Sequence, residues 1–383
     1  MLNNLLKLII YTLNIPLYWI SYFIPKKKNL WIFGAWFGDR YSDNSKYIFD
    51  YVNKNYRMVR GVWLTKSKTV YNELKKQNRE VYYSYSFKGY IYTMLADKVI
   101  VSSGYVDVNR FVINRSVVIN LWHATNLKKI GCDADRNFSY KCQNPRFSIF
   151  YLKYFLFPFL KRPYDYVLAS SQESRLKMES AFCIDSSNVI IAGLPRTDIL
   201  KRVNNTNFTI AYLPTFRDNT NYNYFENFNV KNMDEYFKNN QIKFLYKPHY
   251  AENNKWSINT QTIEKINNDD IYEILTFVDI LITDYSTVFF DYCLTDRPMI
   301  FTPFDYETYT THDRKLYYDY NEVTPGPKCY NWEQVVFEIN KILEGYDEYS
   351  NQRRQINEKF NMYQDFNNRR RLVDKIIELP MHK

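Results

Sequence analysis

The sequence predicts an α/β protein with two domains, each built on a parallel sheet. From residue 29 onward, short apolar runs alternate with segments of helical spacing, and strands that alternate with helices imply a parallel sheet. A polar stretch at 203–209 interrupts this alternation, and a new apolar run begins at its end. The length of 383 residues also favours two domains over one.

In the first half, the strands and helices follow one another without a long break. A short apolar strand that ends in a glycine-bearing loop is expected at 29–38. Further strands are expected at 60–65, 80–85, 98–102 and 116–125, with helices at 46–56, 69–77 and 88–97 between them. Two more units, each a strand followed by a helix, are expected at 164–182 and 188–200.

The second half repeats this organisation and ends in helices. Strands that lead into polar loops are expected within 208–219, 242–250, 278–294 and 298–309, and residues 331–360 have helical spacing. Polar residues follow the apolar strands repeatedly. Because open α/β sheets bind ligands outside the carboxyl ends of their strands, candidate site residues can be read strand by strand.

The charge and the cysteines limit the classes of function. The net charge of +10 indicates nucleic acid, an anionic membrane surface or a phosphorylated substrate as partner. Nucleic acid is the weakest of these, because no zinc-finger spacing, RNA-recognition motif or basic recognition helix occurs. The five cysteines are odd in number and show no CxxC spacing, which indicates free thiols in a reducing compartment. No acidic cluster predicts a metal, and no cofactor is expected.

The N-terminal segment, residues 1–28, predicts contact with a membrane. Residues 8–24 carry no charge, Pro16 interrupts them, and the aromatic residues Trp19 and Tyr22 favour a membrane interface. Three lysines follow, Lys26, Lys27 and Lys28. A signal peptide has its basic residues before the apolar run, so this order excludes one. We expect a kinked segment lying in the cytoplasmic leaflet; a buried first helix and a membrane-spanning helix are the alternatives.

Four polar residues at strand ends are candidates for chemistry. His123 ends the strand in VVINLWHAT, and His249 ends another in FLYKPHY. A neutral imidazole at such a place can act as a general base. Arg217, in LPTFRDN, and Lys247, beside His249, suit phosphate oxygens. The alternatives are structural histidines and, for Arg217, a surface pair with the adjacent aspartate.

The stretch ILITDYSTVFFDYCL places Asp284, Ser286 and Thr287 in a turn between a buried strand and a buried helix. Ser286 or Thr287 would cap the helix, since their hydroxyls accept hydrogen bonds from free amides. The same amides and the helix dipole make an anion site. Simple capping is the alternative. Together with the basic strand ends, the turn predicts a pyrophosphate site.

Five ordered motifs, NLWHAT, LPTFRDN, LYKPHY, LITDYSTVFFDYCLTDRPMIFTPFDYETY and YYDYNEVTPGP, resemble those of the CDP-glycerol glycerophosphotransferases, which build teichoic acids and related capsules. The resemblance covers about residues 30–375 and implies a GT-B arrangement of two Rossmann-like domains. It implies that His123 is the general base, with His249 as a second catalytic histidine that also holds the donor. The donor pyrophosphate would be held by Arg217, Lys247, Ser286, Thr287 and Arg314. Thr215, Asp284 and Asp291 would be donor-side or structural residues.

The resemblance also implies a reaction and a location. Glycerol phosphate would pass from CDP-glycerol to a hydroxyl of a lipid-linked saccharide or polymer acceptor, with release of CMP, at the cytoplasmic face of the membrane. CDP-ribitol as donor, a nucleotide-sugar glycosyltransferase and a non-catalytic membrane scaffold remain alternatives. The acceptor domain is expected at 29–202 and the donor domain at 203–360, with a C-terminal helix at 361–383 packed back on the acceptor domain.

Overall fold

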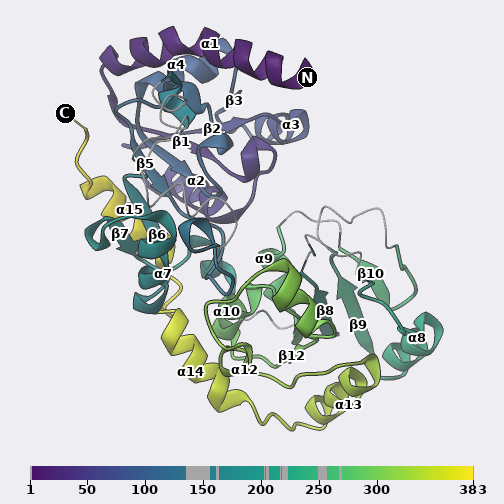
Figure 1. Ribbon diagram of the computed structural model, residues 1–383. Coiled ribbons are helices and arrows are strands. Elements are labelled where there is room, and N and C mark those ends of the chain that lie inside the picture. The colour runs from purple at the N-terminus through teal and green to yellow at the C-terminus, as the bar shows by residue number, and fades with distance from the viewer. Residues whose placement is uncertain are drawn as a thin grey trace.

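The computed structural model describes residues 2–134, 156–160, 164–201, 203, 207–215, 217, 223–248, 257–266 and 270–382. These residues form two sheets, and every strand pair within them is parallel. Figure 1 shows the sheets in two separate halves of the molecule, which we call the N-terminal and C-terminal halves. The predicted α/β class with two parallel sheets is confirmed.

The N-terminal half contains a seven-stranded sheet of order β3-β2-β1-β4-β5-β6-β7. Its strands are β1 (Lys27–Gly34), β2 (Arg60–Thr65), β3 (Val81–Tyr83), β4 (Ala96–Val101), β5 (Val117–Asn120), β6 (Tyr166–Ala169) and β7 (Val189–Ile191). Its α-helices include α2 (Asp43–Asn55), α3 (Lys68–Lys76), α4 (Phe87–Leu95) and α7 (Gln172–Phe182). Strands such as β4 are buried along their whole length, as expected for a sheet that has helices on both faces.

The C-terminal half contains a five-stranded sheet of order β10-β9-β8-β11-β12. Its strands are β8 (Phe208–Leu213), β9 (Ile242–Tyr246), β10 (Ile263–Lys265), β11 (Ile280–Thr283) and β12 (Met299–Phe301). Its α-helices include α8 (Val230–Asn239), α9 (Tyr272–Leu275), α10 (Val288–Tyr292), α11 (Tyr306–Thr308), α12 (Tyr320–Val323) and α13 (Trp332–Leu343). Aromatic side chains fill much of its core, where Trp332 contacts Tyr212 and Phe228.

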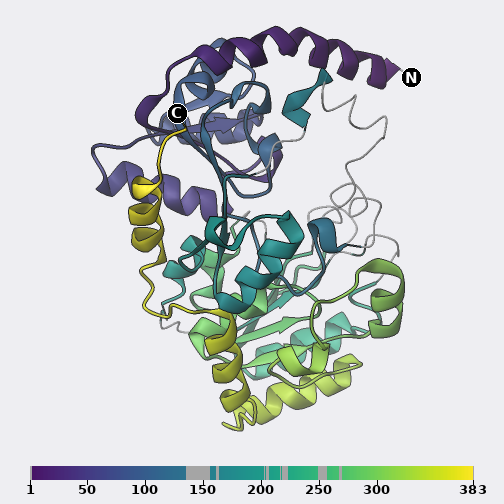
Figure 2. The same cartoon turned by 60° about the vertical axis from the view of Figure 1, so that its left-hand side comes forward.

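The last two helices connect the halves. Helix α14 (Ser350–Phe360) contacts α7 as well as α10, and α15 (Asn368–Glu378) contacts α2. Leu372, Val373 and Ile376 of α15 lie in the same buried cluster as β1 and β2. Figures 1 and 2 show this yellow segment passing from the C-terminal half back to the N-terminal half.

Helix α1 (Leu2–Phe23) lies along the surface of the N-terminal half, as Figures 1 and 2 both show. One side packs on the protein: Tyr11 and Tyr18 contact Phe159, and the buried Asn14 accepts a hydrogen bond from Tyr90. The other side is apolar and exposed, with Leu13 68% and Phe23 77% exposed. The alternative of a buried first helix is therefore wrong.

Of the three lysines predicted to contact the membrane, Lys26 does not face outward. Lys26 donates a hydrogen bond to the carbonyl of Met94 at 2.7 Å, so its ammonium group faces the protein and not a lipid surface. Lys27 and Lys28 are exposed and already belong to β1. Helix α1 continues through Pro16, and by length and composition residues 5–23 could cross a membrane.

Candidate active site

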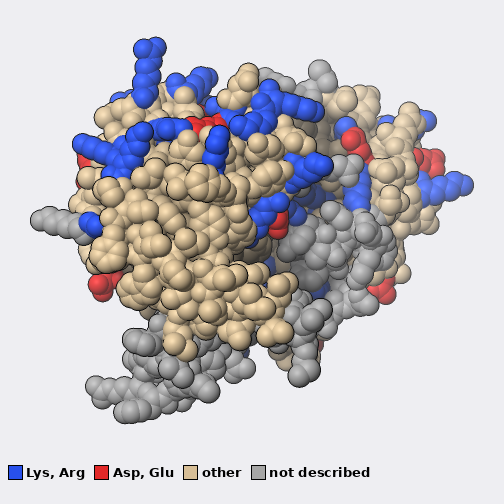
Figure 3. Space-filling view, turned by 90° about the horizontal axis from the view of Figure 1, so that it is seen from above, with Lys and Arg blue, Asp and Glu red and all other residues tan. Residues whose placement is uncertain are grey.

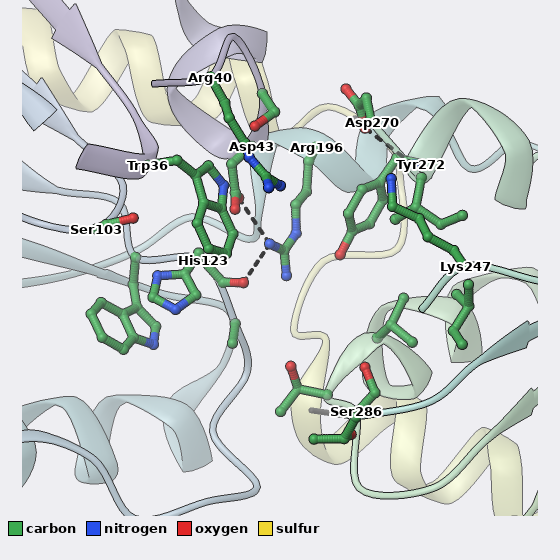
Figure 4. Close-up of a pocket in the computed structure, with 18 of the residues that line it drawn as sticks. Trp36, Arg40, Asp43, Ser103, His123, Arg196, Lys247, Asp270, Tyr272 and Ser286 are labelled. Carbon is green, nitrogen blue, oxygen red and sulfur yellow. Dashed lines mark hydrogen bonds and ion pairs between the residues drawn. The ribbon is translucent and has the colours of Figure 1, made fainter. Parts of the chain in front are cut away.

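A cavity of about 680 Å³ lies between the two halves, at the carboxyl ends of both sheets. Residues that follow β1, β4 and β5 line one side of it, among them Trp36, Ser103 and His123. Residues that follow β8, β9 and β11 line the other side. Figure 4 shows the two sets of side chains facing each other. The order of strands reverses at β1/β4 and at β8/β11, and ligands of open α/β sheets bind at such points.

His123 lines this cavity, and its imidazole is held in one tautomer. Its Nδ1 lies 3.2 Å from the backbone carbonyl of Ser102. A carbonyl oxygen can only accept, so the neutral ring carries its proton on Nδ1, and Nε2 keeps its lone pair. Burial lowers the pKa of His123 below its ordinary value of 6.5. At pH 7 the imidazole is therefore neutral and can accept a proton.

Two indole rings hold the imidazole of His123. The ring of Trp36 lies 5.3 Å from it and the ring of Trp122 lies 4.1 Å from it, between centroids. Trp36 (φ 45°), Trp122 (φ 50°) and the neighbouring Phe37 (φ 61°) all have left-handed backbone conformations, which are rare for large side chains. Strained backbone of this kind concentrates at functional sites. Sequence reasoning had not identified Trp36.

A buried carboxylate, Asp107, shapes the loops beside His123. It accepts hydrogen bonds from the backbone amides of Phe37, Ser102, Ser103 and Gly104, at 2.7–3.2 Å. Burial raises the pKa of Asp107 to about 6 despite these bonds. This one side chain therefore joins the loop after β1 to the loop after β4, whose Ser102 carbonyl sets the tautomer of His123.

The C-terminal half contributes Thr215, Lys247, Ser286, Thr287 and Arg314 to the cavity. All five were predicted as site residues, and the fold brings them together from four separate loops. Thr287 occupies the predicted N-cap position of α10, but its side chain makes no capping hydrogen bond there. The short α10 begins directly behind this turn.

Arg217 does not line the cavity. It is 2% exposed, and its guanidinium forms a bidentate pair with Asp305 (Nε–Oδ2 2.7 Å, Nη2–Oδ1 2.8 Å) and a second pair with Asp284 (2.9 Å). Asp284 also accepts the amide of Thr215. Asp284 and Arg217 thus support the loop that carries Thr215. The predicted direct contact of Arg217 with phosphate does not fit this buried, paired position.

Asp291 is likewise a supporting residue. Its Oδ2 accepts two hydrogen bonds from Arg196, at 2.7 and 3.0 Å, and one from the hydroxyl of Tyr272 at 2.5 Å. Sequence reasoning missed Arg196, although its position after the buried strand in NVIIAGLPR follows the same rule that selected Arg217. Figure 4 shows Arg196 in the middle of the cavity wall, between His123 and Tyr272.

The charge of the cavity suits an anionic ligand. Among the described residues that line it, five are basic, Arg40, Lys128, Arg196, Lys247 and Arg314, and two are acidic, Asp43 and Asp270. Both acids are paired with cations, Asp43 with Arg196 and Asp270 with Lys46. His249 lies outside the described residues. A neutral base that faces a cationic pocket is an arrangement for transferring a phosphorylated group to a hydroxyl.

Comparison with known proteins agrees with this chemistry. Residues 17–378 match the family described as CDP-Glycerol:Poly(glycerophosphate) glycerophosphotransferase. The chain belongs to this family of transferases, so the resemblance predicted from the five motifs is confirmed.

Individual relatives and one solved structure extend this result. The chain is 25% identical over 358 residues to the teichoic acid glycerol-phosphate transferase of Staphylococcus aureus, covering 87% of this chain and 89% of the relative. It is 31% identical over 209 residues to the teichoic acid poly(ribitol-phosphate) polymerase of Bacillus spizizenii, covering 49% of this chain and 34% of that relative. The wall teichoic acid polymerase TagF has the same fold, with a TM-score of 0.74 and 21% identity over 98% of this chain and 97% of that one.

Proposed function

We propose that this protein transfers glycerol phosphate from CDP-glycerol to a hydroxyl of a lipid-linked teichoic-acid or capsule-type acceptor, releasing CMP. The observation that carries the proposal is the cavity itself. It combines a neutral, tautomerically fixed His123 with Lys247, Arg314, Ser286 and Thr287, in a chain of the glycerophosphotransferase family.

In the proposed reaction, the acceptor hydroxyl attacks the phosphorus that bears glycerol. A new bond forms between the acceptor oxygen and this phosphorus, and the bond from phosphorus to the oxygen of CMP breaks. The hydroxyl proton moves to Nε2 of His123. Lys247, Arg314 and the hydroxyls of Ser286 and Thr287 offset the charge on the pyrophosphate and on the CMP that leaves. Phosphoryl transfer depends mainly on such positioning and charge stabilisation.

We assign the two halves different substrates, in a GT-B-like division of labour. The acceptor would bind in residues 29–202, which contribute His123 and the aromatic residues Trp36 and Trp122. The donor would bind in residues 203–360, which contribute the cationic and hydroxyl groups. The position of the cavity supports this division, because residues of both halves line it, and its volume of about 680 Å³ lies in the range of small-molecule sites.

We further propose that the protein binds the cytoplasmic face of the membrane through α1, as a peripheral protein. The exposed side of α1 is apolar and includes Leu13, Trp19, Tyr22 and Phe23. The first acidic residue of the chain is Asp39, so α1 itself carries no negative charge that would oppose anionic headgroups. Figure 3, seen from the α1 side, has a broad tan area bordered by blue Lys and Arg side chains, with few red acidic ones. Apolar burial and basic residues together give stable interfacial binding.

The test is CMP release by purified protein on vesicles with a lipid-linked acceptor. CDP-glycerol, CDP-ribitol and UDP-glucose are offered in parallel, with His123→Ala and His249→Ala beside the wild type. CMP from CDP-glycerol that both variants abolish supports the proposal. CMP from CDP-ribitol alone would change the donor, and UDP release would make the protein a glycosyltransferase. If the protein binds none of these three donors, only a scaffold role would remain.

A further inference from the structure

We infer that Arg196 is a positioning residue that holds the loop of His123 in register with the donor-binding turn at Ser286 and Thr287. The inference rests on the proposed role of His123 as general base. It concerns a side chain that belongs to the N-terminal half but contacts both halves at the centre of the cavity wall (Figure 4).

Arg196 contacts the His123 loop directly. Its Nη1 donates to the backbone carbonyl of His123 at 2.5 Å and to Oδ1 of Asp43 at 2.8 Å. Its own backbone amide donates to Oδ1 of Asn44, whose Nδ2 donates to the carbonyl of Trp122 at 2.9 Å. The loop that carries His123 is thus joined to the 3-10 helix η7 (Pro195–Ile199) in two ways. One runs through the carbonyl of His123, and the other runs through the carbonyl of Trp122 and the side chain of Asn44.

The other edge of the same guanidinium contacts the C-terminal half. Nε and Nη2 both donate to Oδ2 of Asp291, on α10, at 3.0 and 2.7 Å. Asp291 lies four residues after Thr287, about one helical turn behind the turn that faces the donor. Tyr272 completes the contact, since its ring lies 4.7 Å from the Arg196 guanidinium and its hydroxyl donates to the same carboxylate oxygen.

The hydrogen-bond inventory favours positioning over direct substrate contact. A guanidinium has five N–H donors in a rigid fork. Four of those of Arg196 point to Asp43, the His123 carbonyl and Asp291, and the residue is 3% exposed. Because the fork is rigid, the distance and angle between the two loops are set by one planar group. A lysine keeps the charge but cannot reach both loops at once.

The charge of Arg196 also acts on His123. The cation lowers the pKa of His123, as does Arg314, whereas Asp43 raises it. Removing the cation leaves the Asp43 carboxylate without its partner, so both changes raise the pKa of His123. The acid limb of the pH profile should then move to higher pH in a variant without the charge, and stay in place in Arg196→Lys.

The experiment compares Arg196→Met and Arg196→Lys with the wild type and with Arg353→Met as a matched control. Arg353 is also buried and paired with aspartates, Asp347 and Asp296, but it lies away from the cavity. The readouts are kcat for CMP release, the Kd of CDP-glycerol without acceptor, the pH profile of kcat, and the unfolding temperature.

We expect kcat to fall by about a hundredfold in both Arg196 variants, because a misplacement of about 1 Å costs that much. The donor Kd should be unchanged, and only Arg196→Met should shift the acid limb. Arg353→Met should lose thermal stability while its folded fraction keeps the wild-type kcat and pH profile. If Arg196→Met does not fold, the loss of kcat in Arg196→Lys at unchanged donor Kd still tests the inference.

Two results would overturn the inference. Arg196 variants that lose only thermal stability would make the residue a simple link between the halves. A loss of donor affinity that accounts for the whole loss of turnover would make Arg196 a direct donor ligand. Failure of the proposed function is a separate outcome, since the wild type would then release no CMP, or His123→Ala would release it at the wild-type rate.

Discussion

Replacing Arg217 by methionine should show whether this arginine stabilises the fold, as its buried ion pairs indicate, or binds donor phosphate, as its position after a strand predicted. The guanidinium bonds Asp305 through two N–H groups and also pairs with Asp284 at 2.9 Å. All three side chains are buried, with the arginine 1% exposed and the carboxylates 2% and 8% exposed. Arg217→Met keeps a similar apolar stem but leaves two buried carboxylates without a cation.

The expected cost is large. Removing one partner of a buried ion pair costs about 3–5 kcal/mol, against a total free energy of unfolding of about 5–15 kcal/mol for a typical native state. In domains of about 150–250 residues, each 1 kcal/mol lowers Tm by about 2–4 °C. We therefore expect a fall in Tm of about 6–20 °C in thermal unfolding.

The control is Arg354→Met. Arg354 pairs with Asp296 at 3.1 Å on the surface, and the two side chains are 62% and 45% exposed. Exposed pairs contribute about 0–1 kcal/mol, so Tm should hardly change. The reasoning is refuted if Arg217→Met unfolds like the wild type and yet no longer binds CDP-glycerol. Arg217 would then be a direct phosphate ligand, as its place after a strand suggested.

Three further predictions concern the cavity and α1. His123→Ala should lower kcat by a factor of about 10²–10⁴ with an unchanged Kd for CDP-glycerol. Because burial lowers the pKa of His123 below 6.5, the kcat of the wild type should stay constant down to that pH. It should fall only at lower pH, as the base becomes protonated. Ser286→Ala should raise the KM for CDP-glycerol by about tenfold to a hundredfold, the value of one hydrogen bond to a charged group. Ser187→Ala should not, because Ser187 is an exposed serine of the 3-10 helix before β7 and does not line the cavity. Leu13→Glu should weaken binding to anionic vesicles by about tenfold or more without lowering Tm, because Leu13 is exposed; equal binding by the variant would exclude α1 as the contact.

The positions of most cavity residues could be predicted from the sequence because parallel sheets collect strand ends. Thr215, Lys247 and Ser286 each follow a different apolar strand, and His123 follows a strand of the other sheet. In a parallel sheet all carboxyl ends lie at one edge. The local pattern of an apolar run followed by a polar residue therefore carried information about three-dimensional proximity, although those residues are far apart in the chain.

The role of each arginine depended instead on neighbours that are distant in sequence. Arg196 and Arg217 both follow an apolar strand and a proline, and nothing local distinguishes them. The partner of Arg196 on α10 is 95 residues away, and the partner of Arg217 after β12 is 88 residues away. A guanidinium binds whichever anion the fold brings to it, a carboxylate or a phosphate. The sequence alone determined the two parallel sheets, the cationic strand ends and the family; only tertiary packing decided which cations line the cavity and which hold its loops together.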